Sequence, residues 1–438
     1  MKTLTQPRTL PGTMELLPQD QILMNEIQQV IKNGYESYGF LPLDTPIIES
    51  SEVLLTKSGG ETEKQIYRFN KGDNDICLRF DLTVPLAKYV AANMNELTFP
   101  FRRYQIGKVY RGEKPQKGRF REFYQCDIDV IGKEKLSVRT DAEMPCIIYD
   151  IFSKLNIGKF TINISNRKLI TGLIENLGLT NIKDEVTHLI DKYYKIGRET
   201  VKLTLIDDLK VDEKSALTIM DFVEIDGNND EKLEKLKTFV KGNETYTLGV
   251  EELSEVVKLI RLGGVKEDYF KINLTIVRGL DYYTGTVYET TIDDYPSLGS
   301  VCGGGRYDNL SEYYTNTKLP GVGISIGITR LFYQLKEAGL IKSSTTSMTK
   351  LLIVPMDENQ IDYCVGIANK FRANGINTEV YTQNSKFKDK LSYANKLNIP
   401  YCLIVGEDEI ASGKLTLKDM VKREQIVDDL DVILKEIK

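Results

Sequence analysis

Histidine is almost absent from this chain of 438 residues, and its scarcity excludes several kinds of active site. The single histidine, His188, lies in the run DEVTHLIDKYY. The apolar spacing of that run predicts a helix, so we expect a helix residue rather than a catalytic one. Zinc sites of the HExxH type, Cys/His sites and most Ser/His triads cannot be assembled around one such residue. The chemistry must therefore depend on carboxylates, arginines, phenols and bound ions.

Cysteine pairs and long apolar runs are absent as well. The six cysteines form no CxxC pair and have no partner histidines, so we expect neither a metal site nor a disulfide framework, and a reducing compartment fits best. The first residues lack the apolar core of a signal peptide, and no run approaches 18 apolar residues. We therefore expect a cytoplasmic protein without a membrane span.

The net charge is only −5, which argues against a protein that coats nucleic acid by bulk attraction but leaves room for a local basic face. The length predicts two or three domains. We expect a first domain at residues 1–338, interrupted at about 168–265 by a helical insertion of long charged stretches. The hydrophilic segment 339–350 predicts a linker, and alternating strands and helices in 351–438 predict a small α/β domain.

Residues 101–111 and 120–131 predict two strands joined by the basic loop GEKPQKGR, which makes a long hairpin. On the returning strand five side chains share one parity and would line one face of the sheet. They are Arg121, Phe123, Gln125, Asp127 and Asp129. A cation, an aromatic plate, an amide and two carboxylates on one face describe a floor for a polar ligand. A solvent-exposed hairpin with weak salt bridges is the alternative interpretation.

Three further runs carry polar groups beside glycines. Residues 278–289, RGLDYYTGTVYE, place a cation, a carboxylate and two phenols within six residues. A core strand has no use for that density of polar groups, because burying them unpaired would cost several kcal/mol. The glycines of CGGGRYD (302–308) would let the backbone pass close to a small side chain, or would form a tight turn. In GVGISIGITRLFYQL (321–335) a buried strand leads into a helix that begins near Arg330, where helix end and guanidinium could bind phosphate together.

Taken together, these motifs resemble those of histidyl-tRNA synthetases, a family of class II aminoacyl-tRNA synthetases. The hairpin resembles the second class II motif, and the Arg330 region resembles the third, although Thr329 departs from the glutamate usual there. RGLDYY, CGGGRYD and LRFDLTVP (78–85) resemble runs specific to the histidyl enzymes. The resemblance spans the whole chain. It implies an α+β catalytic domain with an antiparallel sheet and a helical insertion, a C-terminal α/β anticodon-binding domain at 351–438, and a homodimer.

Site residues follow from the resemblance position by position. Those implied to bind histidine are Asp81, Thr83, Arg111, Gln125, Asp129, Arg278, Tyr282 and Tyr283. Within this set, the first two and Gln125 would hold the α-amino group, and Asp129 and Tyr283 would contact the imidazole. Those implied to bind ATP are Arg111, Glu113, Arg121, Phe123 and Arg330. Arg111 and Arg278 would be the catalytic arginines. Some members have glutamate where this chain has Asp81 and Asp129.

The implied reaction activates L-histidine with ATP and Mg²⁺ and then transfers it to tRNA(His). Arginines and Mg²⁺ suffice for such chemistry, because it depends mainly on positioning and charge stabilisation. The hairpin loop would meet the tRNA acceptor end through Lys114, Gln116, Lys117 and Arg119. Four lysines of the C-terminal domain could meet tRNA phosphates or could simply be solvated, namely Lys386, Lys388, Lys390 and Lys396.

Two alternatives belong to the same superfamily. A non-catalytic paralogue serves as a regulatory subunit of ATP phosphoribosyltransferase in histidine biosynthesis. Such paralogues typically lose the arginine of RGLDYY and lack the anticodon-binding domain, whereas this chain keeps Arg278 and a C-terminal domain. A prolyl, threonyl or glycyl synthetase would leave the histidine-specific runs unexplained.

Overall fold

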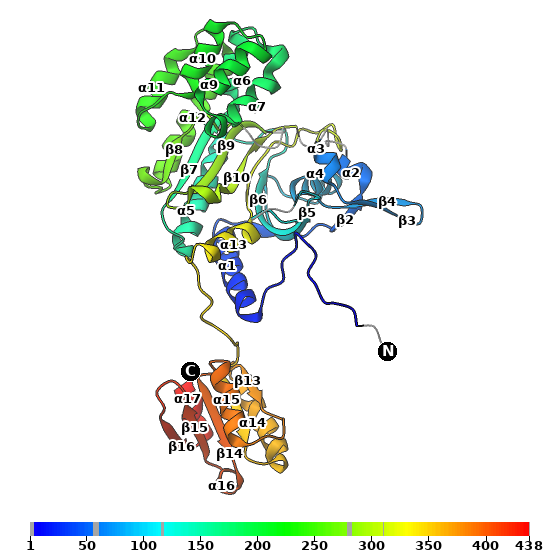
Figure 1. The fold of residues 1–438 in the computed structure, drawn as a ribbon, viewed down its shortest axis with the longest axis vertical. Coiled ribbons are helices and arrows are strands. Elements are labelled where there is room, and N and C mark those ends of the chain that lie inside the picture. The colour runs from blue at the N-terminus through cyan, green and yellow to red at the C-terminus, as the bar shows by residue number, and fades with distance from the viewer. Residues whose placement is uncertain (1–3, 56–60, 115–117, 278–282, 310, 438) are drawn as a thin grey trace. The chain divides into compact units, whose positions relative to one another are not determined.

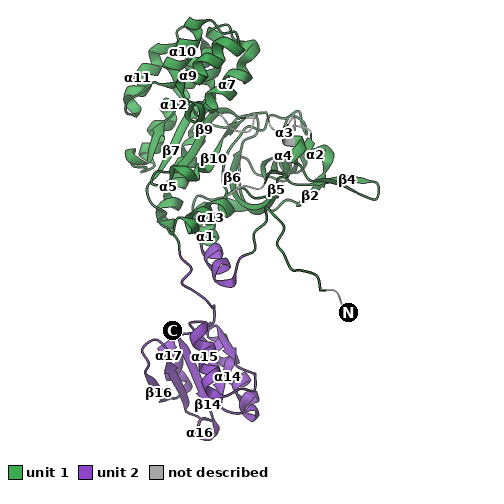
Figure 2. Cartoon of the chain, in the orientation of Figure 1, with its two compact units in different colours: residues 1–15, 27–341 green, residues 16–26, 342–438 purple. Residues whose placement is uncertain are grey.

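A computed structural model describes residues 4–55, 61–114, 118–277, 283–309 and 311–437 of the chain. The chain divides into two compact units (Figure 2). The first comprises Met1–Glu15 and Ile27–Ile341, and the second comprises Leu16–Glu26 and Lys342–Lys438. Among the described residues, no helix combines the length and the apolarity needed to cross a bilayer.

The first unit is built on an eight-stranded sheet with the order β1-β5-β6-β11-β10-β9-β7-β8 (Figure 1). Its strands are β1 (Leu41–Pro42), β5 (Phe101–Tyr110), β6 (Glu122–Ile131), β7 (Phe160–Asn166), β8 (Phe270–Ile272), β9 (Tyr283–Ile292), β10 (Ser300–Tyr307) and β11 (Gly321–Ile326). Neighbouring strands run antiparallel except at the two ends, where β1 pairs with β5 and β7 pairs with β8 in parallel. The predicted antiparallel sheet is confirmed, and Pro42 lies on an edge strand as its missing N–H requires.

One face of this sheet is covered by α1 (Pro18–Ser37) and α5 (Glu143–Leu155). The Tyr35 ring of α1 lies 6.0 Å from the Tyr104 ring of β5, and Tyr104 pairs with Ile128 of β6. The Phe152 ring of α5 lies 5.4 Å from the Phe160 ring of β7. Because side chains alternate along a strand, the even-numbered residues of β6 face α1 and the odd-numbered ones face the other way.

The first unit also contains a small second sheet and several short helices. A three-stranded sheet has the order β2-β4-β3, from β2 (Ile48–Ser50), β4 (Asn74–Leu78) and β3 (Arg68–Lys71). It is followed by α4 (Thr83–Ala92), and α2 (Ser51–Leu55) and α3 (Glu61–Gln65) lie in the same part of the sequence. Helix α13 (Ile328–Glu337) follows β11 directly, so the predicted strand and helix at 321–335 are confirmed.

Every regular element between Arg167 and Leu262 is helical. The main helices are α6 (Arg167–Asn176), α7 (Lys183–Asp191), α8 (Tyr193–Ile196), α9 (Arg198–Leu203), α10 (Glu213–Val223), α11 (Asn229–Phe239) and α12 (Glu244–Leu262). The polar run DGNNDE begins α11, where Asn228 and Glu231 form a reciprocal capping box. His188 is an exposed residue of α7, as predicted from its helical context.

The second unit contains a five-stranded sheet with the order β13-β12-β14-β15-β16. Its strands are β12 (Leu351–Pro355), β13 (Thr378–Val380), β14 (Tyr401–Val405), β15 (Leu415–Asp419) and β16 (Gln425–Asp428), with the helices α14 (Ile361–Ala373), α15 (Phe387–Lys396), α16 (Glu407–Ser412) and α17 (Leu430–Ile437). Alternate residues of β12 enter two separate cores. Leu351 packs with residues of α14 and α17, whereas Leu352 packs with residues of α15. The predicted small α/β domain is confirmed.

Candidate active site

Two cavities lie on the large sheet, on the face of β6 that points away from α1. The smaller, of about 50 Å³, is lined by Asp81, Thr83, Arg111, Gln125, Asp127, Asp129, Tyr283, Tyr307, Gly323, Ile324 and Ser325. The larger, of about 510 Å³, is lined by Gln65, Arg111, Glu113, Gly118, Arg119, Phe120, Phe123, Gln125, Ser300, Val301, Cys302, Gly303, Ser325, Gly327 and Arg330. Arg111, Gln125 and Ser325 belong to both, so the two cavities share one wall.

Strand register explains why these side chains meet. Asp127 of β6 lies between Gln105 of β5 and Ser325 of β11, and Ser325 in turn lies opposite Gly303 of β10. Asp129 lies between Arg103 and Gly323 in the adjacent row. These residues therefore share one face of four neighbouring strands, which leaves a polar floor under both cavities.

A glycine is required beside Asp129. A Cβ atom at Gly323 would lie 2.2 Å from Asp129 Oδ1 and 2.4 Å from the carbonyl oxygen of Ile128. Real Cβ atoms do not approach other atoms so closely. Gly323 of the run GVGIS thus makes room for a buried carboxylate.

Asp129 is held by two partners that the sequence did not identify. Its Oδ2 forms an ion pair of 2.6 Å with Arg103 Nη2, and its Oδ1 accepts a hydrogen bond of 2.8 Å from the Tyr307 hydroxyl. Burial raises the pKa of Asp129 to about 6, although the charge of Arg103 acts in the opposite direction. The parity of CGGGRYD could have indicated Tyr307, which shares a face with the first and third glycines of that run.

Asp127 and Gln125 lie next to each other on the same face of β6. Gln125 Nε2 donates a 2.7 Å hydrogen bond to Ser325 Oγ, and the Ser325 hydroxyl hydrogen-bonds the Asp127 carboxyl group. Burial raises the pKa of Asp127 to about 7, and Arg103 and Ser325 lower it. Asp127 Oδ1 and Gln125 Oε1 are buried and have no hydrogen-bond partner among the described residues.

The opposite wall of the smaller cavity is the start of α4. Asp81 Oδ1 accepts hydrogen bonds from the main-chain N–H groups of Thr83 at 3.1 Å and Val84 at 2.9 Å, so it caps this helix. Burial raises the pKa of Asp81, whereas these N–H groups and the charge of Arg111 lower it. Asp81 is therefore fixed in place before any ligand arrives.

Cationic and aromatic groups dominate the larger cavity. The Arg111 guanidinium lies 4.4 Å from the centre of the Phe80 ring and 5.2 Å from that of Phe123. Arg330 Nη2 donates to the carbonyl oxygen of Leu298 at 2.8 Å, while Arg330 Nε is buried without a partner among the described residues. Burial, followed by the charge of Arg119, lowers the pKa of Arg330. Cations that disfavour one another in a partly buried cavity indicate a site for an anion.

The structure brings most of the predicted residues together. Of the predicted histidine-binding set, the smaller cavity is lined by Asp81, Thr83, Arg111, Gln125, Asp129 and Tyr283. Of the predicted ATP-binding set, the larger cavity is lined by Arg111, Glu113, Phe123 and Arg330. The predicted residues Arg278, Tyr282, Gln116 and Lys117 lie outside the described residues.

Arg121 does not line either cavity. It precedes the first residue of β6, and its main-chain N–H donates to the carbonyl oxygen of Gly12 at 2.6 Å. Its guanidinium donates to the carbonyl oxygens of Glu113 at 3.1 Å and Pro11 at 3.4 Å. The side chain therefore ties the hairpin to the N-terminal segment. Arg119, which was predicted to contact tRNA, lines the larger cavity instead and lies 3.5 Å from Glu113.

Thr329 has a structural explanation. Its side-chain oxygen accepts a 2.8 Å hydrogen bond from the main-chain N–H of Tyr124. Thr329 is buried at the start of α13, so this bond connects the helix that carries Arg330 to strand β6.

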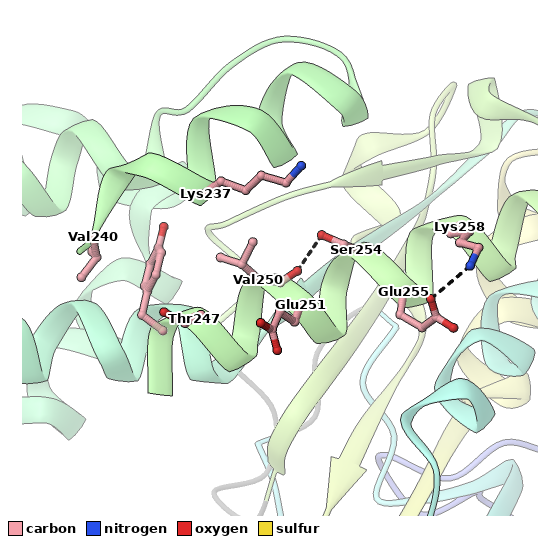
Figure 3. Close-up of a pocket in the computed structure, with 9 residues that line it drawn as sticks. Lys237, Val240, Thr247, Val250, Glu251, Ser254, Glu255 and Lys258 are labelled. Carbon is pink, nitrogen blue, oxygen red and sulfur yellow. Dashed lines mark hydrogen bonds and ion pairs between the residues drawn. The ribbon is translucent and has the colours of Figure 1, made fainter. Parts of the chain in front are cut away.

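The helical insertion contains a third cavity, of about 460 Å³, between α11 and α12 (Figure 3). Its lining mixes apolar residues such as Val240 and Val250 with polar residues, several of which are hydrogen-bonded or ion-paired within their own helix. The Ser254 hydroxyl donates to the carbonyl oxygen of Val250 at 2.7 Å, and Lys258 lies 3.5 Å from Glu255 (Figure 3). No convergent set of carboxylates and arginines comparable with that of the sheet cavities lines it in this part of the described chain.

The second unit has a cavity of its own, of about 410 Å³, where β12 and β13 end. It is lined by Tyr381 and by Lys390, whose Nζ donates to the carbonyl oxygen of Pro355 at 2.7 Å. Lys390 is buried, while the other lysines considered for tRNA contact are exposed, namely Lys386, Lys388 and Lys396. The four lysines do not form one surface, because Lys390 faces the sheet.

Comparisons with known proteins agree with this geometry. A model of the histidyl-tRNA synthetase family matches residues 12–331, and a model of an anticodon binding domain matches residues 350–438. A histidine–tRNA ligase of Clostridium tetani is 50% identical over 444 residues, which cover 100% of this chain and 99% of that relative.

Solved structures show the same likeness. The crystal structure of a histidyl-tRNA synthetase from a Nostoc species has a TM-score of 0.89 and 40% identity, and covers 99% of each chain. A protein of Bacillus halodurans described as an ATP phosphoribosyltransferase regulatory subunit/histidyl-tRNA synthetase has a TM-score of 0.75. It is 18% identical and covers 92% of this chain and 99% of its own, and at that identity it shows the fold alone.

Proposed function

The chain belongs to the histidyl-tRNA synthetase family, and we propose that its two adjoining cavities hold the two small substrates of that reaction. The protein is an enzyme, an ATP-dependent ligase that joins L-histidine to tRNA(His). The observation that carries the proposal is the shared wall: Arg111, Gln125 and Ser325 face both cavities. Two reactants that must come into contact fit two cavities with a common wall.

In the smaller cavity, Asp129 and Tyr283 would contact the imidazole of histidine, and Asp81, Thr83 and Gln125 would surround the α-amino group. The supporting observation is that all five side chains line this cavity. Because the cavity is small and its carboxylates are fixed by partners, it would discriminate strongly against amino acids that lack the imidazole nitrogens.

In the larger cavity, Phe123 would stack on adenine, and Arg119 and Arg330 would hold the phosphates. Both arginines line the cavity, and the charge of Arg119 lowers the pKa of Arg330. We infer that Arg119 rather than Arg121 supplies the hairpin's contact to phosphate. Arg121 would contribute indirectly by holding the hairpin against Pro11 and Gly12.

The reaction then proceeds in two steps. A carboxylate oxygen of histidine attacks the α-phosphorus of ATP, the bond to the bridging oxygen breaks, and pyrophosphate leaves. The 3′-terminal ribose hydroxyl of tRNA next attacks the histidyl carbonyl carbon, and AMP leaves. Arg111 lies on the common wall, where it would stabilise the charge that develops on the α-phosphate during the first step. By resemblance to the family, Arg278 would be the second catalytic arginine.

Mg²⁺ would bind with ATP. Among the described residues that line the larger cavity, Glu113 is the one carboxylate, and no group of three His, Cys, Asp or Glu side chains in the described chain is placed to hold a metal ion. This fits an ion held mainly by phosphate oxygens with one protein carboxylate. When bound, the ion would neutralise phosphate charge.

For tRNA, we propose that the two domains have different roles. Residues 1–338 would carry out catalysis, and residues 351–438 would bind the anticodon arm. Residues 339–350 would form the linker between them. The hairpin loop would contact the acceptor end through Gln116 and Lys117. In the second unit, the ring of Tyr381 and the buried cation of Lys390 would form a stacking site for a base.

A regulatory role in histidine biosynthesis is not favoured. Full-length relatives that are about half identical to this chain are ligases, whereas the likeness to the regulatory-subunit structure has an identity of 18%. We also propose a homodimer, by family, and a cytoplasmic location, for which the six buried, unpaired cysteines are suited.

The test is amino-acid-dependent exchange of pyrophosphate into ATP across the twenty amino acids. Histidine alone should support exchange, and Arg111→Ala should reduce it by roughly 10²–10³-fold, as expected for loss of a donor aimed at transition-state charge. Arg139→Ala, at an exposed arginine, serves as the matched control and should leave the rate unchanged. Exchange with proline, or none from folded protein, would contradict the proposal.

A further inference from the structure

We propose that Asp127 is an additional histidine-binding residue, whose unpartnered carboxylate oxygen accepts a hydrogen bond from the α-ammonium group of the substrate. The inference rests on the proposed function, because it assigns a role within the histidine cavity. Asp127 lines that cavity and is 3% exposed. The family resemblance did not assign it a role.

A buried acceptor, Asp127 Oδ1, has no donor among the described residues. Asp127 Oδ1 has no hydrogen-bond partner among the described residues, whereas the carboxyl group is already hydrogen-bonded by the Ser325 hydroxyl. Buried carboxylate oxygens are almost always paired, because leaving one desolvated and unpaired is costly. No described protein group fills this role, which leaves the oxygen available to a donor on a ligand that enters the cavity.

Arg103 does not supply that partner. Its Nη2 pairs with Asp129, while its Nε and Nη1 are buried without a hydrogen-bond partner among the described residues. Arg103 consequently influences Asp127 through charge rather than through a hydrogen bond. A purely structural pairing of Asp127 with the buried arginine is thus excluded by the geometry.

The charges of the described residues in this cavity leave an excess of negative charge, which favours binding of a cation. Three carboxylates, from Asp81, Asp127 and Asp129, lie in the cavity wall. They are opposed by two guanidiniums, Arg111 in the wall and Arg103 in the ion pair with Asp129. One negative charge remains in excess, and burial raises the pKa of all three carboxyl groups. A single ammonium group would balance the site.

The position within the cavity distinguishes the ammonium from the imidazole. The carboxylate of histidine must reach the larger cavity, so the α-carbon and its ammonium must lie beside the common wall. Asp127 is hydrogen-bonded to Ser325, which belongs to that wall. Asp129 is instead bonded to Tyr307 and Arg103, neither of which lines the larger cavity. Asp127 therefore lies at the ammonium end and Asp129 at the imidazole end.

Gln125 supports this assignment. Its amide nitrogen is committed to Ser325, so the orientation of the amide leaves Oε1 as an acceptor, and that oxygen is also buried without a partner. Asp127 Oδ1 and Gln125 Oε1 thus offer two acceptors beside the common wall. An ammonium group carries three donors and can use both.

The experiment compares the full chain with its Asp127→Asn and Asp127→Ser variants. Calorimetric titration would measure binding of L-histidinol, which keeps the ammonium and the imidazole, and of imidazolepropionate, which lacks the ammonium. Each variant should weaken histidinol binding by at least about tenfold, equivalent to about 1.4 kcal/mol, and leave imidazolepropionate binding within about twofold. The serine variant guards against failure of the asparagine variant to fold, and Asp226→Asn, at an exposed position, is the matched control.

Pyrophosphate exchange by the same proteins completes the test. The KM for histidine should rise in the Asp127 variants while the KM for ATP stays unchanged. Equal weakening of histidinol and imidazolepropionate, or no weakening of either, would overturn the role of Asp127. Absence of histidine-dependent exchange in the unsubstituted chain would instead overturn the proposed function, so the two failures are distinguishable.

Discussion

At the scale of single residues, the histidine cavity is defined by carboxylates that would be unfavourable elsewhere. Asp127 and Asp129 are both about 3% exposed, and burial raises their pKa values to about 7 and about 6. Their neighbours are Asp81 and Arg103, which act on them with opposite signs. The ionised form of these buried carboxylates is therefore unfavourable, and a bound cation would stabilise it.

This cost predicts a pH dependence of stability. The pKa of Asp127 in the folded chain, about 7, exceeds its value of about 3.9 in the unfolded chain. The folded state therefore binds the proton more tightly, and the stability that protonation contributes is lost as the pH rises through the folded pKa. Asparagine cannot ionise, so the melting temperature of Asp127→Asn, relative to that of the unsubstituted chain, should rise between about pH 4 and about pH 7 and level off above that.

Differential scanning calorimetry of the ligand-free proteins would measure this. Asp226→Asn replaces an exposed carboxylate and should show a difference that does not change with pH. A constant difference for Asp127→Asn as well would show that Asp127 does not titrate in this range.

At the scale of elements, the site depends on the register of β5, β6, β11 and β10. The alternation along β6 was sufficient to predict that Gln125, Asp127 and Asp129 share a face. The same alternation could not reveal Arg103 or Ser325, because they belong to strands whose register is fixed by pairing across the sheet rather than by local sequence.

The close approach of β6 and β11 yields the next prediction. Gly323→Ala would place a Cβ atom 2.2 Å from Asp129 Oδ1 and 2.4 Å from the Ile128 carbonyl oxygen. Because main-chain atoms cannot move away cheaply, we expect a loss of stability of about 1–3 kcal/mol together with a raised KM for histidine. Gly366→Ala is the matched control, because no atom lies within 4 Å of a Cβ at that position.

Chemical denaturation and exchange kinetics on the two glycine variants would check this. Equal behaviour of both variants would show that the strands can separate to accept a methyl group. The glycines of GVGIS would then have no steric role.

The sequence motifs predicted the site best where its residues are local. The helix after GVGISIG carries Arg330 as expected, and α4 begins at Thr83, two residues after Asp81, whose carboxylate accepts hydrogen bonds from the first N–H groups of that helix. The position of Arg121 could not be predicted from strand alternation alone. Its parity matched the floor of the site, but it precedes β6, and a segment more than a hundred residues earlier in the sequence accepts its hydrogen bonds. Such a long-range contact leaves no periodic signal.

At the scale of the whole molecule, all the residues that line the two substrate cavities belong to the first compact unit. The second unit has its own sheet and two cores of its own, one of them formed with α14 and α17. In the proposed function, substrate activation and recognition of the anticodon arm would thus depend on separate sets of residues.

A chain that ends at Ile341 should therefore still support histidine-dependent pyrophosphate exchange, within roughly tenfold of the full chain, while aminoacylation of tRNA falls much further. The comparison requires a thermal unfolding curve for the shortened chain, because Leu16–Glu26, which includes the start of α1, is grouped with the second unit. Loss of exchange from a folded, shortened chain would show that the second unit contributes to activation.

The wall common to both cavities has a thermodynamic consequence. In the proposed site, Arg111, Gln125 and Ser325 would contact whichever substrate is bound, so ordering them for one substrate would prepare them for the other. Linkage requires that any factor by which histidine tightens ATP binding equals the factor by which ATP tightens histidine binding. Through these three side chains, each substrate would thus increase the affinity of the protein for the other.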